Sequence, residues 1–317
     1  MGKNLRFFVV VILVSYLSAC QTLPARTNPL NFQRGIVVRE SGELFLRPCF
    51  STEKYRIYDD TGDLRDWFAK APQVVQQVYV ELMARPAEAK QDSLHIQKVL
   101  MAGFQPRACE FELNGNRFRA AGVEPFWIAD IRREGIRVQG YKGLNRLLFP
   151  VADPGQQGND RVWRSQLTAQ KVYRLKLTLT EKPCYDAYGM RYRYQADLLL
   201  NKESFKGCAR DGNLGQRTLP GVYLPQNPQQ LMRLQLQPDG GALLSEGVQE
   251  QGNTIVSHTK GRWTLAEPGQ VRLVLDGENK TRRVWLFSRV RDGSLALMRR
   301  GQANHRTGLT LHREYQN

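Results

Sequence analysis

Short runs in which apolar and polar residues alternate recur along this chain of 317 residues, and they constrain its fold more than any other feature. A period of two is typical of β-strands with one buried face, whereas the 3.6-residue period of amphipathic helices is scarce here. Turn-forming pairs such as Asp-Gly and Pro-Gly separate the runs. No repeat of fixed length is visible, which excludes solenoids and propellers. The chain is therefore predicted to be mainly β.

The first group of runs, in residues 35–113, is predicted to form one small domain. A short helix is expected over residues 64–71, ended by Pro72. Five strands and one helix in about 80 residues suit an OB-like barrel. The five strands are expected at Glu43–Phe50, Lys54–Tyr58, Gln77–Met83, Leu94–Leu100 and Cys109–Leu113.

Two further antiparallel β domains are predicted in residues 114–212 and 213–317. The middle domain is expected to be a β-sheet or half-barrel, and the last one a β meander or half-barrel with regularly spaced turns. Strands of the middle domain are predicted at Phe118–Ala121, Glu124–Arg132, Gly135–Gly140, Lys171–Thr180, Tyr192–Leu200 and Phe205–Ala209. Those of the last domain are predicted at Met232–Gln237, Ala242–Glu246, Gly261–Leu265, Val271–Leu275, Val284–Val290 and Leu295–Arg299.

Residues 1–19 have the pattern of a secretion signal. Lys3 and Arg6 precede the apolar run Phe7–Leu17, which is shorter than the roughly 20 residues of a membrane-spanning helix. The next residues, Leu-Ser-Ala-Cys, resemble a bacterial lipobox, in which the thiol of the cysteine (here Cys20) receives diacylglycerol before cleavage. The alternative is an ordinary signal peptide followed by a chance cysteine.

Acylation of Cys20 would anchor the chain to a membrane, because each buried methylene group contributes about 0.8 kcal/mol. The next residue is Gln21 and not Asp, which by resemblance to other bacterial lipoproteins favours the periplasmic face of the outer membrane. Residues 20–34 contain two prolines and little hydrophobic periodicity, so they are predicted to be a lipidated tether.

Four cysteines remain after Cys20, and an even number in an exported chain favours disulfides. Of the three possible connectivities, we predict Cys49 with Cys109 and Cys184 with Cys208, because each pair then falls inside one domain. The sequence contains no Cys-x-x-Cys motif and so signals neither a thioredoxin-like site nor a zinc ribbon.

The formal charge of +16 is distributed unevenly. Residues 20–112 hold 12 basic and 12 acidic residues, residues 113–212 hold 18 and 10, and residues 213–317 hold 14 and 8. The excess therefore lies in the second and third domains. No nucleic-acid-binding motif accompanies it, and nucleic acid is not expected as a partner.

Basic residues alternate with apolar ones in several predicted strands, which places cations on one face of a sheet. Such a face can bind an acidic component of the cell envelope, or it can be an ordinary solvated surface. Arg174 and Lys176 show this spacing. The candidate contacts to a partner are Arg191, Arg193, Arg282 and Arg283.

Two stretches of the middle domain carry a family resemblance. Gly122–Trp127 reads Gly-Val-Glu-Pro-Phe-Trp, and Cys184–Met190 is followed by Gly207-Cys208-Ala209. Together they resemble an uncharacterised family of bacterial periplasmic lipoproteins with Gly-x-Glu-Pro-Phe-Trp, Cys-x-Asp-x-Met-Ser-Gly and Gly-Cys-Ala motifs. The resemblance covers residues 116–210 and implies no activity. Residues 187–190, Ala-Tyr-Gly-Met, depart from the family's Met-Ser-Gly.

The last domain resembles the N-terminal half-barrel of NlpE-like lipoproteins, which are linked to copper tolerance and surface sensing. The likeness lies in Gly221–Pro225, Gly261–Trp263 and Val271–Asp276. In that family a Cys-x-x-Cys pair suited to Cu(I) follows the Leu-Pro. Here those positions are Gln226 and Gln229, so the resemblance does not imply copper binding.

No catalytic or metal-binding constellation is apparent in the sequence, and no cofactor is expected. The four histidines are scattered, and the motifs of zinc proteases and α/β-hydrolases do not occur. Residues 59–63, Asp-Asp-Thr-Gly-Asp, lack the ligand spacing of a calcium loop and are predicted to be a turn.

These features predict a lipid-anchored lipoprotein of the cell envelope that binds or senses and is not an enzyme. Its expected partners are the membrane, through the acylated N-terminus, and an acidic component such as lipopolysaccharide, anionic lipid or a protein. One alternative is an inhibitor of an envelope hydrolase such as lysozyme, although cationic lysozymes would be repelled by the positive domains. The other is an enzyme on envelope polymers, which needs two carboxylates converging in a cleft.

Overall fold

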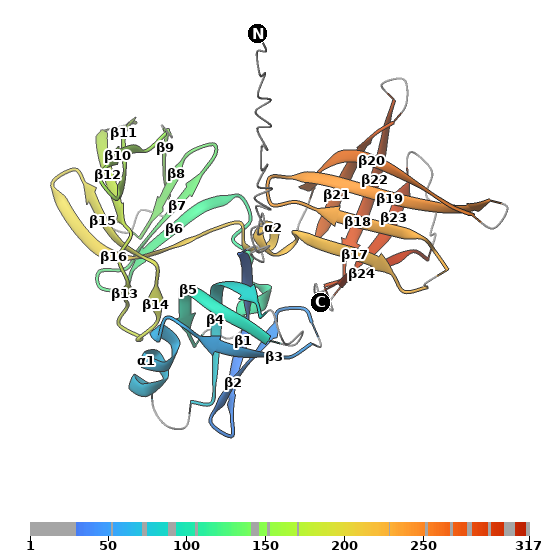
Figure 1. Ribbon diagram of the computed structural model, residues 1–317. Helices are drawn as coiled ribbons and strands as arrows, with labels where there is room; N and C mark the ends of the chain where they lie inside the picture. Colours follow the sequence, from blue (N-terminus) through green and yellow to red (C-terminus); the bar gives the residue numbers. More distant parts are fainter. Residues whose placement is uncertain are drawn as a thin grey trace, which may run out of the picture.

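The computed structural model shows three β domains, in agreement with the predicted mainly β fold (Figure 1). It describes residues 30–314 except 52, 72–74, 88–92, 105–106, 141–145, 151–152, 170, 228, 251–252, 267–268, 278–280, 291–292 and 301–307. The predicted signal peptide and Cys20 lie outside the described residues.

The first domain is a closed five-stranded barrel with one helix. Its strands follow the cyclic order β1-β2-β3-β5-β4, and β4 pairs back to β1. The β3–β5 pair is parallel, the others are antiparallel, and the helix lies between β3 and β4. This is the OB-like arrangement that the sequence predicted. The elements are β1 (Asn31–Glu40), β2 (Glu43–Pro48), β3 (Tyr55–Asp59), α1 (Asp63–Lys70), β4 (Gln77–Pro86) and β5 (Ser93–Gly103).

The turn predicted at residues 59–63 starts the helix. The Asp59 carboxylate accepts hydrogen bonds from the backbone N–H groups of Leu64 and Arg65, both at 3.0 Å. These groups have no partner within the helix itself, so Asp59 satisfies them as a capping residue does. On its inner side the helix buries Leu64, Trp67 and Phe68 against the barrel.

Two expectations for the first domain are wrong. The predicted tether extends to residue 34, but β1 begins at Asn31 and its residues Phe32 and Arg34 are buried. The prolines and asparagines nearby hid the alternation that continues into Ile36–Val38. The strand expected at Cys109–Leu113 is a short 3₁₀ helix, η1 (Ala108–Glu110), followed by irregular backbone.

The second domain is a single nine-stranded sheet curled into a half-barrel, with strand order β10-β11-β12-β15-β16-β6-β7-β8-β9. The Ser165 hydroxyl on β11, the second strand of the sheet, donates to the Pro150 carbonyl just after β9, the last strand, so the sheet curls back on itself. The core contains Phe118, Trp127 and Trp163. The strands are β6 (Asn116–Gly122), β7 (Trp127–Arg132), β8 (Ile136–Gln139), β9 (Leu147–Phe149), β10 (Gly155–Gln157), β11 (Asp160–Thr168), β12 (Val172–Thr180), β15 (Tyr194–Leu200) and β16 (Glu203–Asp211).

A small hairpin in the middle third of the chain belongs to the first domain's sheet. Strands β13 (Cys184–Tyr185) and β14 (Arg191–Tyr192) pair with each other, and β14 pairs with β5. The predicted strand Tyr192–Leu200 is therefore two strands separated by a bend at Arg193, and each strand joins a different sheet. Because β14 and β15 follow each other in the chain but pair in different sheets, they attach the second domain to the first.

Both predicted disulfides are confirmed. Cys49–Cys109 joins the end of β2 to η1 within the first domain. Cys184–Cys208 joins the hairpin strand β13 to β16, so it connects the sheets of the first two domains.

The Gly122–Trp127 motif packs the edge of the second core. Trp127 is 1% exposed and donates its indole N–H to the Lys206 carbonyl, whereas Phe126, in the turn before β7, is 61% exposed. A Cβ on Gly122 would lie 2.2 Å from the Trp127 ring nitrogen, and one on Gly207 would lie 2.1 Å from the Ala121 carbonyl oxygen. The glycines of both motifs therefore allow β6, β7 and β16 to approach closely.

The third domain is an eight-stranded antiparallel barrel in simple up-and-down order, closed by pairing of β17 with β24. The closure goes beyond the expected meander or half-barrel. Trp263, Trp285 and Phe287 fill the interior. A short helix, α2 (Leu214–Thr218), leads into it. The strands are β17 (Gly221–Pro225), β18 (Met232–Leu236), β19 (Gly241–Glu250), β20 (Asn253–Leu265), β21 (Gln270–Asp276), β22 (Arg282–Arg289), β23 (Leu295–Arg300) and β24 (Thr310–Glu314).

Candidate binding surface and domain junction

The four arginines predicted to contact a partner do not form one surface. Arg191 is only 4% exposed, because it holds the hairpin on the first domain. One of its guanidinium nitrogens donates to the Val99 carbonyl, and the other lies 2.5 Å from an Asp63 carboxylate oxygen. The prediction for Arg191 is therefore wrong: this side chain is an internal tie between β14, β5 and α1.

Arg193 is also occupied by internal contacts. Its guanidinium lies 3.1 Å from Glu181 and 3.2 Å from Asp211 and stacks over the Tyr194 ring. Burial opposes the charge on Arg193, but the Asp211 and Glu181 carboxylates outweigh that effect and raise its pKa. Arg193 lies at a bend between β14 and β15, so it does not continue a row of cations along one strand face as the sequence predicted.

Arg282 and Arg283 are adjacent in β22 and point to opposite sides of the barrel wall. Arg283 lies 3.4 Å from Glu246 and donates to the Thr259 hydroxyl at 3.1 Å. Arg282 is exposed, and its partner in strand register is Asp276. Arg282 therefore lies at the surface, and the Arg283 side chain is 40% exposed although it pairs with Glu246.

A cationic row does exist on the second domain, on the outer face of β11 and β12. Arg164 is the register partner of Lys176, and Arg174 lies two residues before Lys176 on the same face. All three side chains are exposed, and among the described residues none of them forms an ion pair. They line a shallow depression with Gln166, Leu199 and Asn201. We call Arg164, Arg174 and Lys176 the cationic row.

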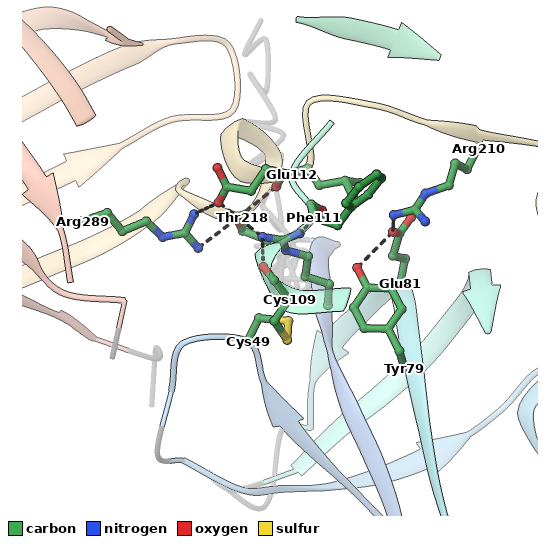
Figure 2. Close-up of a disulfide and its surroundings, with 11 residues drawn as sticks. Cys49, Tyr79, Glu81, Cys109, Phe111, Glu112, Arg210, Thr218 and Arg289 are labelled. Atoms are coloured by element: carbon green, nitrogen blue, oxygen red, sulfur yellow. Dashed lines mark hydrogen bonds and ion pairs between the residues drawn. A yellow bond between two sulfur atoms is a disulfide. The ribbon is translucent and has the colours of Figure 1, made fainter. Parts of the chain in front are cut away.

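A buried ion-pair chain joins the first domain to the third. The Glu112 carboxylate lies 3.4 Å from Arg34 on β1 and 2.7 Å from Arg289 on β22. Arg34 is completely buried and also donates to the carbonyls of Cys109 and Phe111, at 3.2 Å and 3.1 Å. Burial lowers the pKa of Arg289, because a buried guanidinium loses its hydration. The negative charge of Glu112 opposes this effect and favours the charged form of Arg289. Figure 2 shows Arg289 directed at Glu112 beside the Cys49–Cys109 disulfide.

A second buried group joins the first domain to the second domain. Arg210 on β16 lies 2.6 Å from the Glu81 carboxylate on β4, and the Tyr79 hydroxyl donates to the same oxygen at 3.1 Å (Figure 2). Burial, with the Glu81 charge as a smaller cause, raises the pKa of Tyr79. Tyr79 therefore remains a neutral hydrogen-bond donor to Glu81.

Asp130 anchors a third cluster within the second domain. Its fully buried carboxylate lies 2.6 Å from Arg119 and 2.7 Å from Arg137, and the Asn116 amide donates to it. Burial alone would raise the pKa of Asp130, but the hydrogen bonds from the two arginines hold it below its ordinary value. The cluster fixes β6, β7 and β8 relative to one another.

The described residues hold no group of three or more His, Cys, Asp or Glu side chains placed to bind a metal ion. Gln226 and Gln229, the positions that the sequence comparison placed opposite a cysteine pair, are exposed. No helix within the described ranges is long and apolar enough to cross a membrane.

The chain matches no protein-family model, and comparison with curated proteins gives no match.

Sequence reasoning identified Arg174 and Lys176 from their alternation but missed Arg164 as their neighbour. The alternation within one strand could not identify Arg164, because only the pairing of β11 with β12 brings Arg164 beside Lys176. The buried pairs at the junction join residues that are 78 to 177 positions apart. No local pattern distinguishes such residues from ordinary surface charges.

Proposed function

We propose that this protein is a lipid-anchored, non-catalytic binding module of the cell envelope, and that its second domain docks on an acidic envelope surface. The cationic row is the observation that supports this most strongly. Three cations that form no ion pair with the described residues stand on one open sheet face, so their charge is available to an external partner. By contrast, internal carboxylates neutralise arginines within the second domain and at the domain junctions, namely Arg119, Arg191, Arg193 and Arg289.

The partner class that suits the row is an anionic lipid surface. A flat array of Arg and Lys attracts phosphate groups by about 1 kcal/mol for each cation near a negative membrane. Leu199, 39% exposed, lies beside Lys176 and adds an apolar contact at the same face. Acidic proteins are the second partner class, and lipopolysaccharide phosphates share the chemistry of the first.

The predicted anchor gives this surface access to a membrane. Nine residues lie between Cys20 and Leu30, and an extended chain over these ten residue steps spans at most about 35 Å. An acylated Cys20 therefore restricts the three domains to the neighbourhood of the bilayer. The weak individual contacts of the row then act at a high effective concentration of lipid.

An enzymatic alternative finds less support at the junction. Among the described residues, the cavity where the three domains meet has one carboxylate in its lining, Asp211, which is paired with Arg193 and Arg217. A glycosidase-type reaction needs two carboxylates facing a substrate. The binding function is therefore the one that we propose.

Cosedimentation with vesicles tests the proposal. The triple variant Arg164→Gln, Arg174→Gln, Lys176→Gln should lose most binding to phosphatidylglycerol vesicles at 0.1 M salt. The matched control is Arg262→Gln, Arg272→Gln, Arg282→Gln, which removes three exposed cations from the third domain. Wild-type binding should also weaken steeply as salt rises, because the Debye length falls to about 3 Å at 1 M. Equal binding by both triple variants would contradict the proposal.

A further inference from the structure

A cavity of about 650 Å³ lies where the three domains meet, and its lining comes from all of them. Phe32 and Met83 belong to the first domain, Phe118 and Arg161 to the second, and Arg313 to the third. Pockets of 300–1,000 Å³ at domain boundaries are the usual setting of small-ligand sites.

The cavity combines apolar side chains with an excess of positive charge. Its apolar side chains include Leu30, Phe32, Met83 and Phe118. Its charged side chains are four arginines and a single carboxylate, Asp211. The arginines are Arg117, Arg161, Arg217 and Arg313.

Arg161 is the cation best placed for a ligand. It is the register partner of the buried Leu179, so it faces the inside of the half-barrel, opposite to the cationic row. Its guanidinium lies 4.9 Å from the Phe118 ring centroid and 5.8 Å from that of Tyr194, and it forms no ion pair with any described residue. Stacking holds the guanidinium in place while its N–H groups remain able to donate.

Two neighbouring arginines have weak or shared partners. Arg117 lies 3.6 Å from Asp153, which is 97% exposed, and such a pair contributes little. Arg217 stacks 3.9 Å over the Phe32 ring and lies 3.5 Å from Asp211, a carboxylate that it shares with Arg193. An anionic head group placed near Arg161 and Arg117 would supply the negative charge that these two guanidinium groups lack.

We infer that the junction cavity binds a single-chain amphiphile with an anionic head group, the apolar chain lying against Phe32, Met83 and Phe118 and the head group against Arg161. Charge complementarity selects the anion, and the apolar lining selects the chain. The source of the ligand rests on the proposed function: Leu30, the first described residue, lines the cavity, so an anchor at Cys20 keeps the opening near membrane lipid.

Calorimetric titration of the purified full chain tests the inference, with dodecyl phosphate below its micellar concentration as the probe. We expect one site per chain and about tenfold weaker binding in Arg161→Gln, which is the loss of roughly 1.4 kcal/mol for one charge-assisted contact. The matched control is Arg272→Gln, an exposed arginine on β21 that lies outside both the cavity lining and the cationic row, which should bind like the wild type. Equal binding in both variants, or failure of the wild type to bind either dodecyl phosphate or dodecanoate, would overturn the inference.

Further titrations test the head group and the apolar chain of the ligand separately. Dodecanoate in place of dodecyl phosphate decides between a carboxylate and a phosphate head group, and binding of either supports the site. Neutral dodecyl maltoside should not bind, and equal binding would refute the role of charge. The variant Met83→Trp fills the cavity without changing its charge and should abolish binding. This variant tests the site even if Arg161→Gln fails to fold. The cationic-row triple variant should keep the amphiphile site, so the two proposals fail separately.

Discussion

Among the described residues, Glu112 is the carboxylate that pairs with both Arg34 and Arg289, and it links the first and third domains. The change Glu112→Gln leaves two buried guanidinium groups close to each other without an anion, and we expect it to cost about 3 kcal/mol in the free energy of unfolding. Urea titration followed by near-ultraviolet circular dichroism measures this. The control is Glu110→Gln, at an exposed carboxylate nearby, which should cost less than about 0.5 kcal/mol. Similar urea midpoints of unfolding for the two variants would show that the buried ion-pair chain does not join the domains.

Asp130 makes the second domain sensitive to acid. Because its folded-state pKa lies below the ordinary value of 3.8, the stabilisation from Arg119 and Arg137 is complete above that value and is lost as the pH falls through the lowered folded-state pKa. Asp130→Asn should cost about 3 kcal/mol at pH 7 and progressively less below pH 4. Melting curves between pH 7 and pH 2 test this against Asp153→Asn, an exposed carboxylate. A difference that does not change with pH would refute the assignment.

At the scale of elements, the Cys184–Cys208 disulfide attaches the β13–β14 hairpin to β16 across 24 residues. Replacing both cysteines with serine should lower the free energy of unfolding by about 3 kcal/mol, following the loop-entropy estimate. The hairpin is then held mainly by the short β14–β5 pairing and by Arg191, so its 186–190 turn should be cleaved sooner in limited proteolysis. The Cys49→Ser, Cys109→Ser double variant is the control, because it leaves this hairpin attached. Equal cleavage rates in the two variants would contradict the role of the disulfide.

The elements that sequence reasoning predicted well were those with local signals. The α1 helix follows the turn at residues 59–63, and the meander of the third domain follows turn pairs such as Asp-Gly. Errors arose where distant pairing decides the structure. The strand β1 was hidden by neighbouring prolines, and the bend at Arg193 depends on β14 joining another domain's sheet. The same reason explains the misassigned site: alternation shows that cations share a face, but not whether that face is buried.

At the scale of the whole molecule, the proposal requires that the chain be acylated at Cys20. Radiolabelled palmitate should be incorporated into the wild-type chain, and the chain should fractionate with membranes. Cys20→Ala should lose both the label and the membrane association, whereas Cys49→Ser should retain the label because that thiol is held in a disulfide. Label retained in Cys20→Ala would show that the N-terminal segment is not a lipoprotein signal.

The central claim is that the cationic row of the second domain faces a negatively charged membrane, and amine acetylation tests it most directly. Lys176 lies in the row and Lys260 lies on β20 of the third domain, and both side chains are exposed. The acetylation rate of each lysine is measured by mass spectrometry with and without phosphatidylglycerol vesicles. The account predicts that vesicles slow the acetylation of Lys176 several-fold and leave that of Lys260 unchanged. An unchanged rate at Lys176, or equal protection of both lysines, would contradict it.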